Sequence, residues 1–368
     1  MFQSTAETSL LSVERAIAEL RAGRPVLVSH ARSAVLAAGV EAIDAELAGR
    51  LGAVTCGPAR LVLPAARLRR LGLDRAGSGS VALPLIDVKR IARLAMGLGA
   101  RIDAPVAPPD AHDEAALDLV RLALLAPAAV VAPVRPGGLA RGSLVRTRAS
   151  AIRAYRASRA TDLHVVSRAP VPLESARDAE FVVFRGGEGL REQVAVLVGR
   201  PDPAQPVTVR LHSACLTGDL FSSLKCDCGD QLRRTVRYMA AHDGGILLYL
   251  DQEGRGNGIA NKMRAYDLQA KGYDTYDADE VLGFEHDQRR FDFAARMLRV
   301  LGVTRVRLMT NNPDKIAALR KAGLEVVSDQ RILGRRTDEN VRYLVSKRDR
   351  AGHFIDFDAI AAAARPPD

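Results

Sequence analysis

Apolar residues recur along this chain at helical spacing in some segments and in short continuous runs in others. Residues 12–28 predict an amphipathic helix that leads into a short strand, and helix and strand patterns then alternate through the first half. In the second half, apolar runs predict strands at 180–186, 192–199, 207–213, 246–251, 306–310 and 324–328. Helical spacing predicts helices at 231–241, 259–270, 291–301 and 314–322. The pattern predicts a mixed α/β or α+β fold, in which helices flank a mixed sheet.

The length and one proline-rich stretch predict two domains. At about 100 to 200 residues per domain, 368 residues suggest two, each large enough to bury a core. The segment RAPVPLES, which begins at Arg168, contains two prolines that resist helix and predicts a linker. We therefore expect one domain at residues 1–172 and a second at 173–368.

The net charge of +10 is concentrated in the first half, since residues 1–175 hold eight of the ten excess positive charges. Because of this excess of positive charge, a zinc-containing nucleic-acid-binding or regulatory protein is an alternative interpretation. No aromatic and basic residues interleave, however, and no DNA-binding motif is present, so we expect no nucleic acid partner. No apolar run approaches 18 residues and the N-terminus lacks a signal pattern, so we expect a cytoplasmic protein with no membrane partner.

Three of the four cysteines fall close together, which indicates a metal site. Cys215, Cys226 and Cys228 have the spacing C-x10-C-x-C, and three ligands suit a catalytic zinc that keeps one position for water. His212 as a fourth ligand would make the site structural. The alternative is three buried thiols that act as small hydrophobes. Cys56 stands alone and is expected in the core.

A glycine-rich segment and one residue pair suggest a phosphate-binding site. The segment EGRGNG, residues 253–258, follows an apolar strand and precedes a helix, so its amides and Arg255 suit a phosphate, although a tight turn with a surface arginine is the alternative. Lys262 and Tyr266 are four apart and share one helix face, and they can equally be a snorkelling lysine beside a half-buried tyrosine.

Two further segments carry charges in positions that suit an anionic ligand. Asp287 and Arg289 lie on one side of the chain if it is extended, or belong to a solvated charge run. Residues 311–313 open a helix whose first turn carries Lys315, and a cation at this end of a helix suggests an anion nearby.

These motifs in this order resemble GTP cyclohydrolase II, the zinc enzyme that opens GTP at the start of riboflavin biosynthesis. The segments that carry the resemblance are HSACLTGDLFSSLKCDCGDQL, DQEGRGNGIANKMRAY, GYDT, GF..DQR and TNNPDK, within about residues 176–355. The resemblance implies one zinc ion on Cys215, Cys226 and Cys228. For the binding of GTP, the resemblance implies Arg210, His212, Ser213, Glu253, Gly254, Arg255, Thr275, Thr310 and Lys315. It also implies Gln231, as the residue that reads the guanine.

The resemblance also implies the catalytic residues and the reaction. Asp287 is implied as proton acceptor, Arg289 as nucleophile and Tyr266 as a required tyrosine. A guanidinium is protonated and a poor nucleophile, so stabilisation of transition-state charge is a lesser role open to Arg289. Zinc-activated water is implied to attack C8 of the purine. The implied products are 2,5-diamino-6-(5-phosphoribosylamino)pyrimidin-4(3H)-one, formate and pyrophosphate.

Magnesium on the triphosphate and a homodimer are also expected. The alternative is a paralogue that stops at a formamido product or serves another pathway. The chain departs from the family at Ala214, where glutamate is common, and at SDQRILG, residues 328–334, which we expect to be peripheral.

The first half resembles a degenerate 3,4-dihydroxy-2-butanone 4-phosphate synthase. His112 and Glu114 stand where that family has its His-Thr-Glu segment. The acidic loop that would supply magnesium ligands and catalytic carboxylates is replaced by SHARSAVLAAGVEA, residues 29–42. We therefore expect residues 1–172 to be non-catalytic and His112 to be structural or vestigial.

Overall fold

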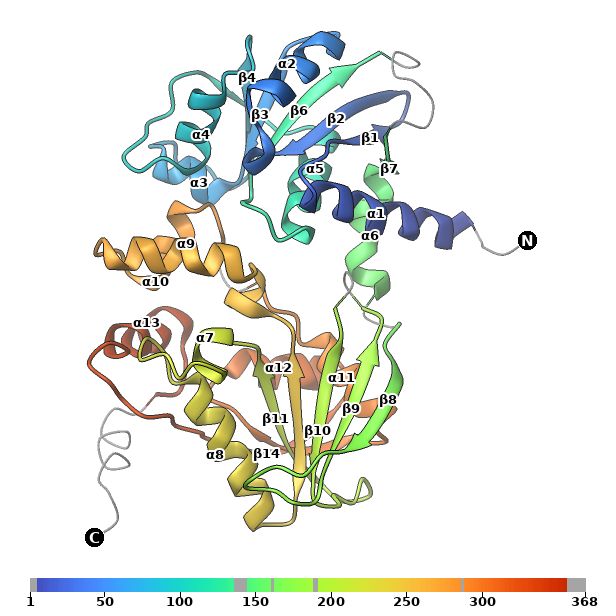
Figure 1. Cartoon of the computed structure of the whole chain (residues 1–368), viewed down its shortest axis with the longest axis vertical. Coiled ribbons are helices and arrows are strands. Elements are labelled where there is room, and N and C mark those ends of the chain that lie inside the picture. The colour runs from blue at the N-terminus through green and yellow to red at the C-terminus, as the bar shows by residue number, and fades with distance from the viewer. Residues whose placement is uncertain (1–4, 136–143, 160–161, 188–190, 286–287, 356–368) are drawn as a thin grey trace. The chain divides into compact units, whose positions relative to one another are not determined.

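The computed structural model describes residues 5–135, 144–159, 162–187, 191–285 and 288–355. The chain forms two compact units (Figure 1). The first comprises residues 1–158, 260–273 and 277–287, and the second comprises residues 159–259, 274–276 and 288–368. Among the described helices, none is both long and apolar enough to cross a membrane.

The first unit is a seven-stranded sheet between two layers of helices. Its strands, in the order β5-β4-β3-β6-β2-β1-β7, are β1 (Val26–His30), β2 (Ser33–Gly39), β3 (Ala59–Leu63), β4 (Gly79–Leu83), β5 (Val106–Ala107), β6 (Ala129–Val134) and β7 (Arg146–Arg148). Its N-terminal helices are α1 (Thr5–Arg21), η1 (Val40–Ala42), α2 (Ala45–Val54), α3 (Ala65–Arg70), α4 (Val88–Met96), α5 (Ala111–Leu122) and α6 (Ala149–Arg159).

Both faces of this sheet are buried. Along β6, Val130 and Ala132 pack in one apolar cluster with residues of α2, α3 and α4, whereas Ala129 and Val131 pack in the other with α1, α5 and α6. Because successive residues of a strand point to opposite faces, one apolar run supplies both clusters. The alternating pattern of the first half therefore produces a three-layered unit.

Two helices from the second half of the sequence, α9 (Ile259–Ala270) and α10 (Thr275–Val281), pack with the first unit over most of their length. The Arg67 guanidinium donates to the carbonyl of Val281 at 2.8 Å, and Arg70 pairs with Asp277 at 2.6 Å. Arg264 pairs with Glu41 at 2.8 Å. Polar contacts of this kind are not visible in a hydrophobicity pattern.

The second unit is built on a mixed seven-stranded sheet, as the pattern predicts. Its strands, in the order β14-β13-β11-β12-β10-β9-β8, are β8 (His164–Pro170), β9 (Ala179–Arg185), β10 (Gln193–Val198), β11 (Val207–Ser213), β12 (Gly245–Leu250), β13 (Arg305–Met309) and β14 (Glu325–Gln330). The strands β14, β13, β11 and β12 are parallel, and β10, β9 and β8 continue the sheet antiparallel. The helices are α7 (Leu216–Asp219), α8 (Cys228–Ala241), η2 (Glu253–Gly256), α11 (Asp292–Val300), α12 (Pro313–Lys321) and α13 (Val341–Ala351).

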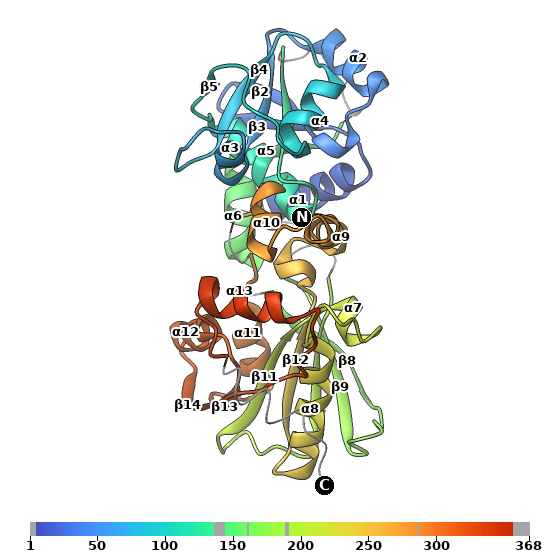
Figure 2. The ribbon, with the colours of Figure 1, turned by 90° about the vertical axis from the view of Figure 1, so that its left-hand side faces the viewer.

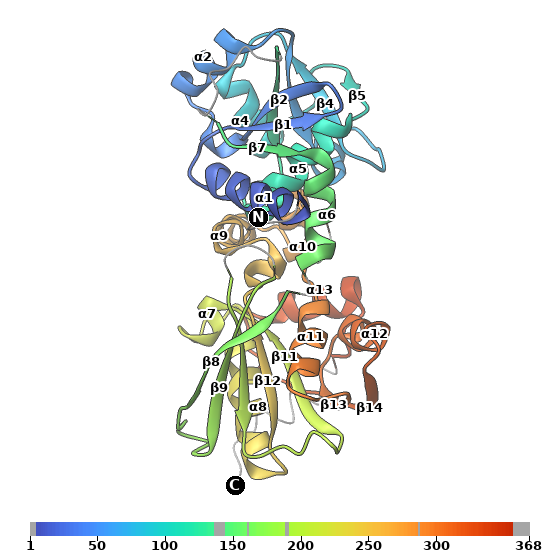
Figure 3. The same cartoon turned by 90° about the vertical axis from the view of Figure 1, so that its right-hand side faces the viewer.

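The helices of the second unit cover opposite faces of its sheet (Figure 2, Figure 3). Val236 and Met239 of α8 pack with Val198 and Leu247 on one face. Residues of α11 and α12 pack with Val209 on the other. The predicted strands and helices of this half are confirmed, whereas α10, α13 and β8 were not predicted.

The expected linker is wrong for its first three residues, because Arg168–Pro170 form the end of β8, which pairs with β9. A proline lacks the N–H that a central strand must donate, but β8 is the edge strand and tolerates it. A proline-rich segment therefore does not mark a linker here.

Candidate functional site

The predicted site residues of the second unit gather at the carboxyl ends of its parallel strands. The chain leaves β11 through α8 to reach β12 on one side, while β13 pairs with β11 on the other side. Ligands of open α/β sheets bind where neighbouring connections diverge in this way, because the loops leave room between them. The segments that follow β11, β12 and β13 carry the cysteines, the glycine-rich segment and Lys315.

The three cysteines form one cluster. Cys215 follows β11, Cys228 begins α8, and the ligand atoms of Cys215, Cys226 and Cys228 all lie within 4.8 Å of one another. Among the described residues, this is the one group of histidine, cysteine or acidic side chains close enough to hold a metal ion. The neighbouring Cys215 thiol raises the pKa of Cys226, and the Cys215 and Cys226 thiols raise the pKa of Cys228.

Gly218 leaves the space that a metal ion needs between these thiols. A Cβ atom at this position would lie 2.7 Å from Sγ of Cys226 and 3.0 Å from Sγ of Cys215. Three soft thiolate donors around a space that a side chain would fill suit zinc. The residues present therefore fit a metal with three protein ligands.

His212 lies outside the cysteine group and makes other contacts. Its Nε2 lies 3.0 Å from an oxygen of Asp219, and its ring stacks on Tyr249 with centroids 5.6 Å apart. Asp219 also accepts the backbone N–H of Cys215 at 2.9 Å and the hydroxyl of Tyr249 at 3.0 Å. Burial lowers the pKa of His212, so the imidazole is neutral. The arrangement favours His212 as a pocket residue over the structural fourth ligand.

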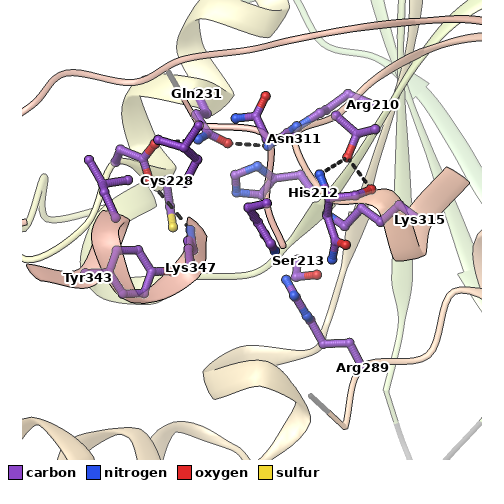
Figure 4. A pocket seen from close by; sticks show the side chains of 16 residues that line it. Arg210, His212, Ser213, Cys228, Gln231, Arg289, Asn311, Lys315, Tyr343 and Lys347 are labelled. Atoms are coloured by element: carbon purple, nitrogen blue, oxygen red, sulfur yellow. Dashed lines mark hydrogen bonds and ion pairs between the residues drawn. The ribbon is translucent and has the colours of Figure 1, made fainter. Parts of the chain in front are cut away.

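Seven of the predicted residues line one pocket of the second unit (Figure 4). These are Arg210, His212, Ser213, Gln231, Arg289, Thr310 and Lys315. Cys228 lines the same pocket and joins it to the cysteine cluster.

The pocket holds an unusual concentration of polar atoms with no hydrogen-bond partner. In the described part of the chain, eight buried side-chain atoms lack a partner. Five of the eight belong to residues of this pocket: Nε of Arg210, Nδ1 of His212, Oγ of Ser213, Oδ1 of Asp227 and Nδ2 of Asn312. Buried polar groups are normally bonded, so this concentration indicates a polar ligand.

Asp227, Gln231 and Arg210 form a connected series of hydrogen bonds along one wall of the pocket. Gln231 donates through Nε2 to Oδ2 of Asp227 at 2.5 Å, and its Oε1 accepts from Arg210. Arg210 donates in addition to the carbonyl of Met309 at 3.0 Å. Burial lowers the pKa of Arg210 to about 10, so the guanidinium stays charged at neutral pH.

The segment 328–334 supports this wall, which corrects the expectation that it is peripheral. A Cβ atom at Gly334 would lie 2.4 Å from Cβ of Asp227, and Arg234 of α8 donates to the carbonyl of Leu333 at 2.9 Å. Ala214 donates its N–H to the carbonyl of Leu250 at 2.8 Å, which ties the ends of two parallel strands together.

The helix α12 begins as predicted and places a buried cation in the pocket. Asn312 caps the helix by accepting the N–H of Asp314 at 2.8 Å, and Pro313 occupies the first turn. Lys315 is 5% exposed and donates to the carbonyl of Leu211 at 2.7 Å. A lysine ammonium carries a positive charge and three donors, which suits an anionic ligand.

The glycine-rich segment uses most of its amides internally. The N–H groups of Gly256, Asn257 and Gly258 donate to the carbonyls of Gln252, Gly254 and Glu253, so they are not available to a phosphate. The Glu253 carboxylate accepts the N–H of Gly254 at 2.8 Å and that of Leu216 at 2.6 Å.

Arg255 is the cationic residue of this segment. It has φ of +59°, a conformation that a residue other than glycine rarely adopts. Its guanidinium lies 4.2 Å from the ring centroid of Tyr276.

The other predicted residues lie elsewhere. Thr275 begins α10, and Tyr266 lies on α9 in the first unit, where Nζ of Lys262 is 5.6 Å from its ring centroid. The shared helix face of Lys262 and Tyr266 is therefore confirmed. Asp287 lies outside the described residues. Cys56 is exposed in the segment before β3, so the expectation of a core position is wrong. Its backbone N–H donates to the carbonyl of Pro133.

Sequence reasoning missed the part of the pocket that comes from α13 and the residues after it. Tyr343, Lys347 and His353 line the pocket together with Asn311. The helix is rich in charged residues, so its apolar pattern is weak. Gly352, with φ of +60°, ends the helix and was the available signal.

The environment of His353 predicts an acid-sensitive stability. Burial, followed by the charges of Lys347, Arg289 and Lys315, lowers the pKa of His353 to about 2. The unfolded chain binds a proton at His353 near the ordinary pKa of about 6.5, and the folded chain does not. The free energy of unfolding therefore keeps its full value above that pH and falls as the pH drops toward 2. Replacing His353 with Gln should flatten this fall by up to about 1.4 kcal/mol per pH unit.

Urea unfolding at pH 7 and pH 5 measures this difference for the wild type and for His353→Gln. His164, which is exposed, provides the control, and His164→Gln should follow the wild-type pH dependence. Identical pH dependence of wild type and His353→Gln would contradict the burial argument.

The chain is similar in sequence to known proteins. A family model described as GTP cyclohydrolase II matches residues 164–331. A GTP cyclohydrolase-2 of Xylella fastidiosa is 44% identical over 366 residues, which cover 98% of this chain and 92% of that protein. A GTP cyclohydrolase-2 of Azospirillum brasilense is 41% identical over 366 residues, with 95% of each chain covered.

Solved structures show a weaker likeness. A two-domain 3,4-dihydroxy-2-butanone 4-phosphate synthase from A. baumannii is 18% identical with a TM-score of 0.33, and the match covers 88% of this chain and 99% of that one. At this TM-score the likeness carries no conclusion.

Proposed function

The chain belongs to the GTP cyclohydrolase II family of enzymes, and from this premise we propose that its second unit hydrolyses GTP at the pocket beside the cysteine cluster. The products are 2,5-diamino-6-(5-phosphoribosylamino)pyrimidin-4(3H)-one, formate and pyrophosphate, in the first step of riboflavin biosynthesis. The observation that carries the proposal is the group of five unpartnered polar atoms in a pocket that Cys228 also lines.

The charges of the pocket suit a triphosphate. Arg210, Arg289 and Lys315 line it, and Arg210 and Lys315 are buried. Buried cations are unfavourable unless an anion compensates them, and a nucleoside triphosphate supplies that charge. We propose that these cations hold the phosphates and that Ser213 and Thr310 provide further hydrogen bonds.

We propose zinc as the metal on Cys215, Cys226 and Cys228, because three thiolates leave one coordination position for water or substrate. When bound there, zinc supplies a Lewis acid that makes water a nucleophile at neutral pH. Neutral His212 can accept a proton at its unpartnered Nδ1. Tyr266 and Asp287 are proposed for further proton transfers, as the family implies.

Arg289 is proposed to stabilise charge rather than to act as a nucleophile. Its guanidinium lies 5.6 Å from the ring centroid of Phe291 and lines the pocket. A guanidinium is protonated in proteins, so it has no free electron pair for attack at phosphorus. It can instead neutralise the charge that develops when pyrophosphate leaves.

Magnesium on the triphosphate, a homodimer and a cytoplasmic location belong to the same proposal. They are supported by the family and by the sequence pattern. Glu253, Gly254 and Thr275 are proposed as further contacts to GTP on the same grounds.

We propose that the domain expected at residues 1–172 is non-catalytic and that the one expected at 173–368 is catalytic. The second unit begins at residue 159, so β8 belongs with the catalytic part. Two of the carboxylates near His112 are already paired, since Arg60 contacts Asp110 at 2.7 Å and Asp113 at 2.6 Å. His112 is buried, and its Nε2 lies 3.4 Å from the hydroxyl of Ser33. Carboxylates neutralised by arginine do not provide the magnesium site that a synthase needs.

Product analysis tests the proposed function. The full chain with zinc, magnesium and GTP should release formate and pyrophosphate in equal amounts together with the diaminopyrimidine. The same preparation with ribulose 5-phosphate and magnesium should form no 3,4-dihydroxy-2-butanone 4-phosphate. Pyrophosphate without formate would overturn the proposed release of formate and favour the paralogue that stops at a formamido product. Formation of the synthase product would overturn the proposal for residues 1–172.

A further inference from the structure

Lys347 enters the pocket from α13, a part of the chain that none of the motifs described above includes. Its side chain is 15% exposed and lines the pocket beside Cys228 (Figure 4). The helix is held at both ends. Fully buried Asn340 donates to the carbonyl of Arg335 at 2.9 Å, and the N–H of Phe354 donates to the carbonyl of Asn311 at 2.9 Å.

The ammonium of Lys347 lacks a hydrogen-bond acceptor among the described residues. Its nearest carboxylate oxygen is Oδ1 of Asp227 at 3.8 Å, which is within the range of an ion pair but too long for a hydrogen bond. The ring of Tyr343 lies beneath the ammonium, 4.1 Å from Nζ to the ring centroid. A largely buried cation with unused donors indicates a missing acceptor.

Asp227 is the matching acceptor with an unused oxygen. It is 4% exposed, and its Oδ1 has no hydrogen bond. Gln231 holds the other oxygen, and Gly334 packs against the side chain. The carboxylate is therefore fixed with one free oxygen beside the Lys347 ammonium.

A donor and an acceptor side by side match the edge of one purine base. Guanine presents the acceptor O6 next to the donors N1–H and N2–H₂, whereas adenine presents a donor at N6 next to an acceptor at N1. Lys347 can donate to O6 while Asp227 accepts from N1–H or N2–H₂. With adenine, the Lys347 donor would face the N6 donor and the Asp227 acceptor would face the N1 acceptor, so both side chains would remain unpaired.

We propose that Lys347 and Asp227 form a guanine-reading pair that determines the base specificity of this pocket. The inference rests on the proposed function and deepens it, because it names the residues that select guanine over adenine. Gln231, which the family implies as a guanine contact, bonds to Asp227 and so lies beside the pair. Lys347 and Asp227 therefore determine which base binds and are not catalytic residues.

Calorimetric titration of the zinc-loaded full chain with GMP and AMP tests the pair. Wild type should prefer GMP. Lys347→Met should weaken GMP binding about 10- to 100-fold, the loss of one hydrogen bond to a charged group, and leave AMP binding unchanged. Lys347→Arg should restore most of the GMP affinity. Asp227→Asn should weaken GMP and tighten AMP, because an amide can donate to adenine N1, and damage to the fold would not tighten any ligand.

Arg348→Met is the matched control, since Arg348 is the next residue on α13, is exposed and pairs with Asp349. It should leave both affinities at wild-type values, and zinc content and melting temperature should be equal in all variants compared. Equal weakening of GMP and AMP by Lys347→Met would overturn the inference in favour of a phosphate contact, and unchanged GMP affinity would overturn it altogether. These titrations need no turnover. A wild type that prefers GMP but releases no formate from GTP would therefore contradict the proposed function and leave the inference standing.

Discussion

Replacing Cys226 with serine is expected to remove the bound metal and formate release together. The three sulfur atoms lie within 4.8 Å of one another, so each contributes to one site. A serine hydroxyl remains protonated at neutral pH and is a poor zinc ligand, and two thiolates do not hold the ion in a catalytic geometry. Since the metal contributes several kcal/mol to transition-state stabilisation, we expect formate release to fall by about 1000-fold or more.

Metal analysis of the purified variant and formate assay with GTP measure both effects. Cys56→Ser is the control, because Cys56 is exposed and lies in the first unit, apart from the cluster. It should keep the wild-type zinc content and rate. Full ring opening by a zinc-free Cys226→Ser protein would contradict the assignment of the metal site.

Replacing Gly218 with alanine is expected to weaken metal binding although all three ligands remain. The added Cβ would lie 2.7 Å from Sγ of Cys226 and 3.2 Å from Cβ of Cys228, so the cysteines would have to separate. Groups that position metal ligands typically contribute 10- to 100-fold to affinity, and we expect at least about a 100-fold loss here because two thiols are displaced.

Competition for zinc with a chelator of known affinity measures this loss. Gly52→Ala is the control, because a Cβ at Gly52 of α2 meets no atom within 4 Å. That substitution should leave the zinc affinity unchanged and slightly stabilise the helix. A Gly218→Ala protein with wild-type zinc affinity would show that the space between the thiols has no role.

The sequence alone was sufficient for the elements whose signal is local. The strands β9–β14 and the helix at Lys315 follow from apolar periodicity and from capping residues such as Asn312. The spacing of the cysteines predicted one cluster, because residues that are two or eleven positions apart in a turn between a strand and a helix are held close together by the chain.

The roles of several residues depended on hydrogen bonds that no local pattern contains. The glycine-rich segment was predicted to offer its amides to a phosphate, but Gly256, Asn257 and Gly258 bond within it. Asp227 lies between two cysteines in the sequence, and no local pattern distinguishes it from an acidic residue on the surface. Its free oxygen and its contact with Gly334 arise only when residue 334 returns to the same wall.

The family, the mixed sheet of the second half and the cysteine cluster follow from the amino-acid sequence, because each depends on residues near one another in the chain. Which residues complete the pocket and which unit each helix joins depends on contacts that form only in the folded chain. Lys347 lies 120 positions after Asp227 in the sequence, and α9 and α10 pack with the first unit through arginines such as Arg67 and Arg70. Such contacts are made by side chains that are polar in any pattern, so their partners are known only when the chain has folded.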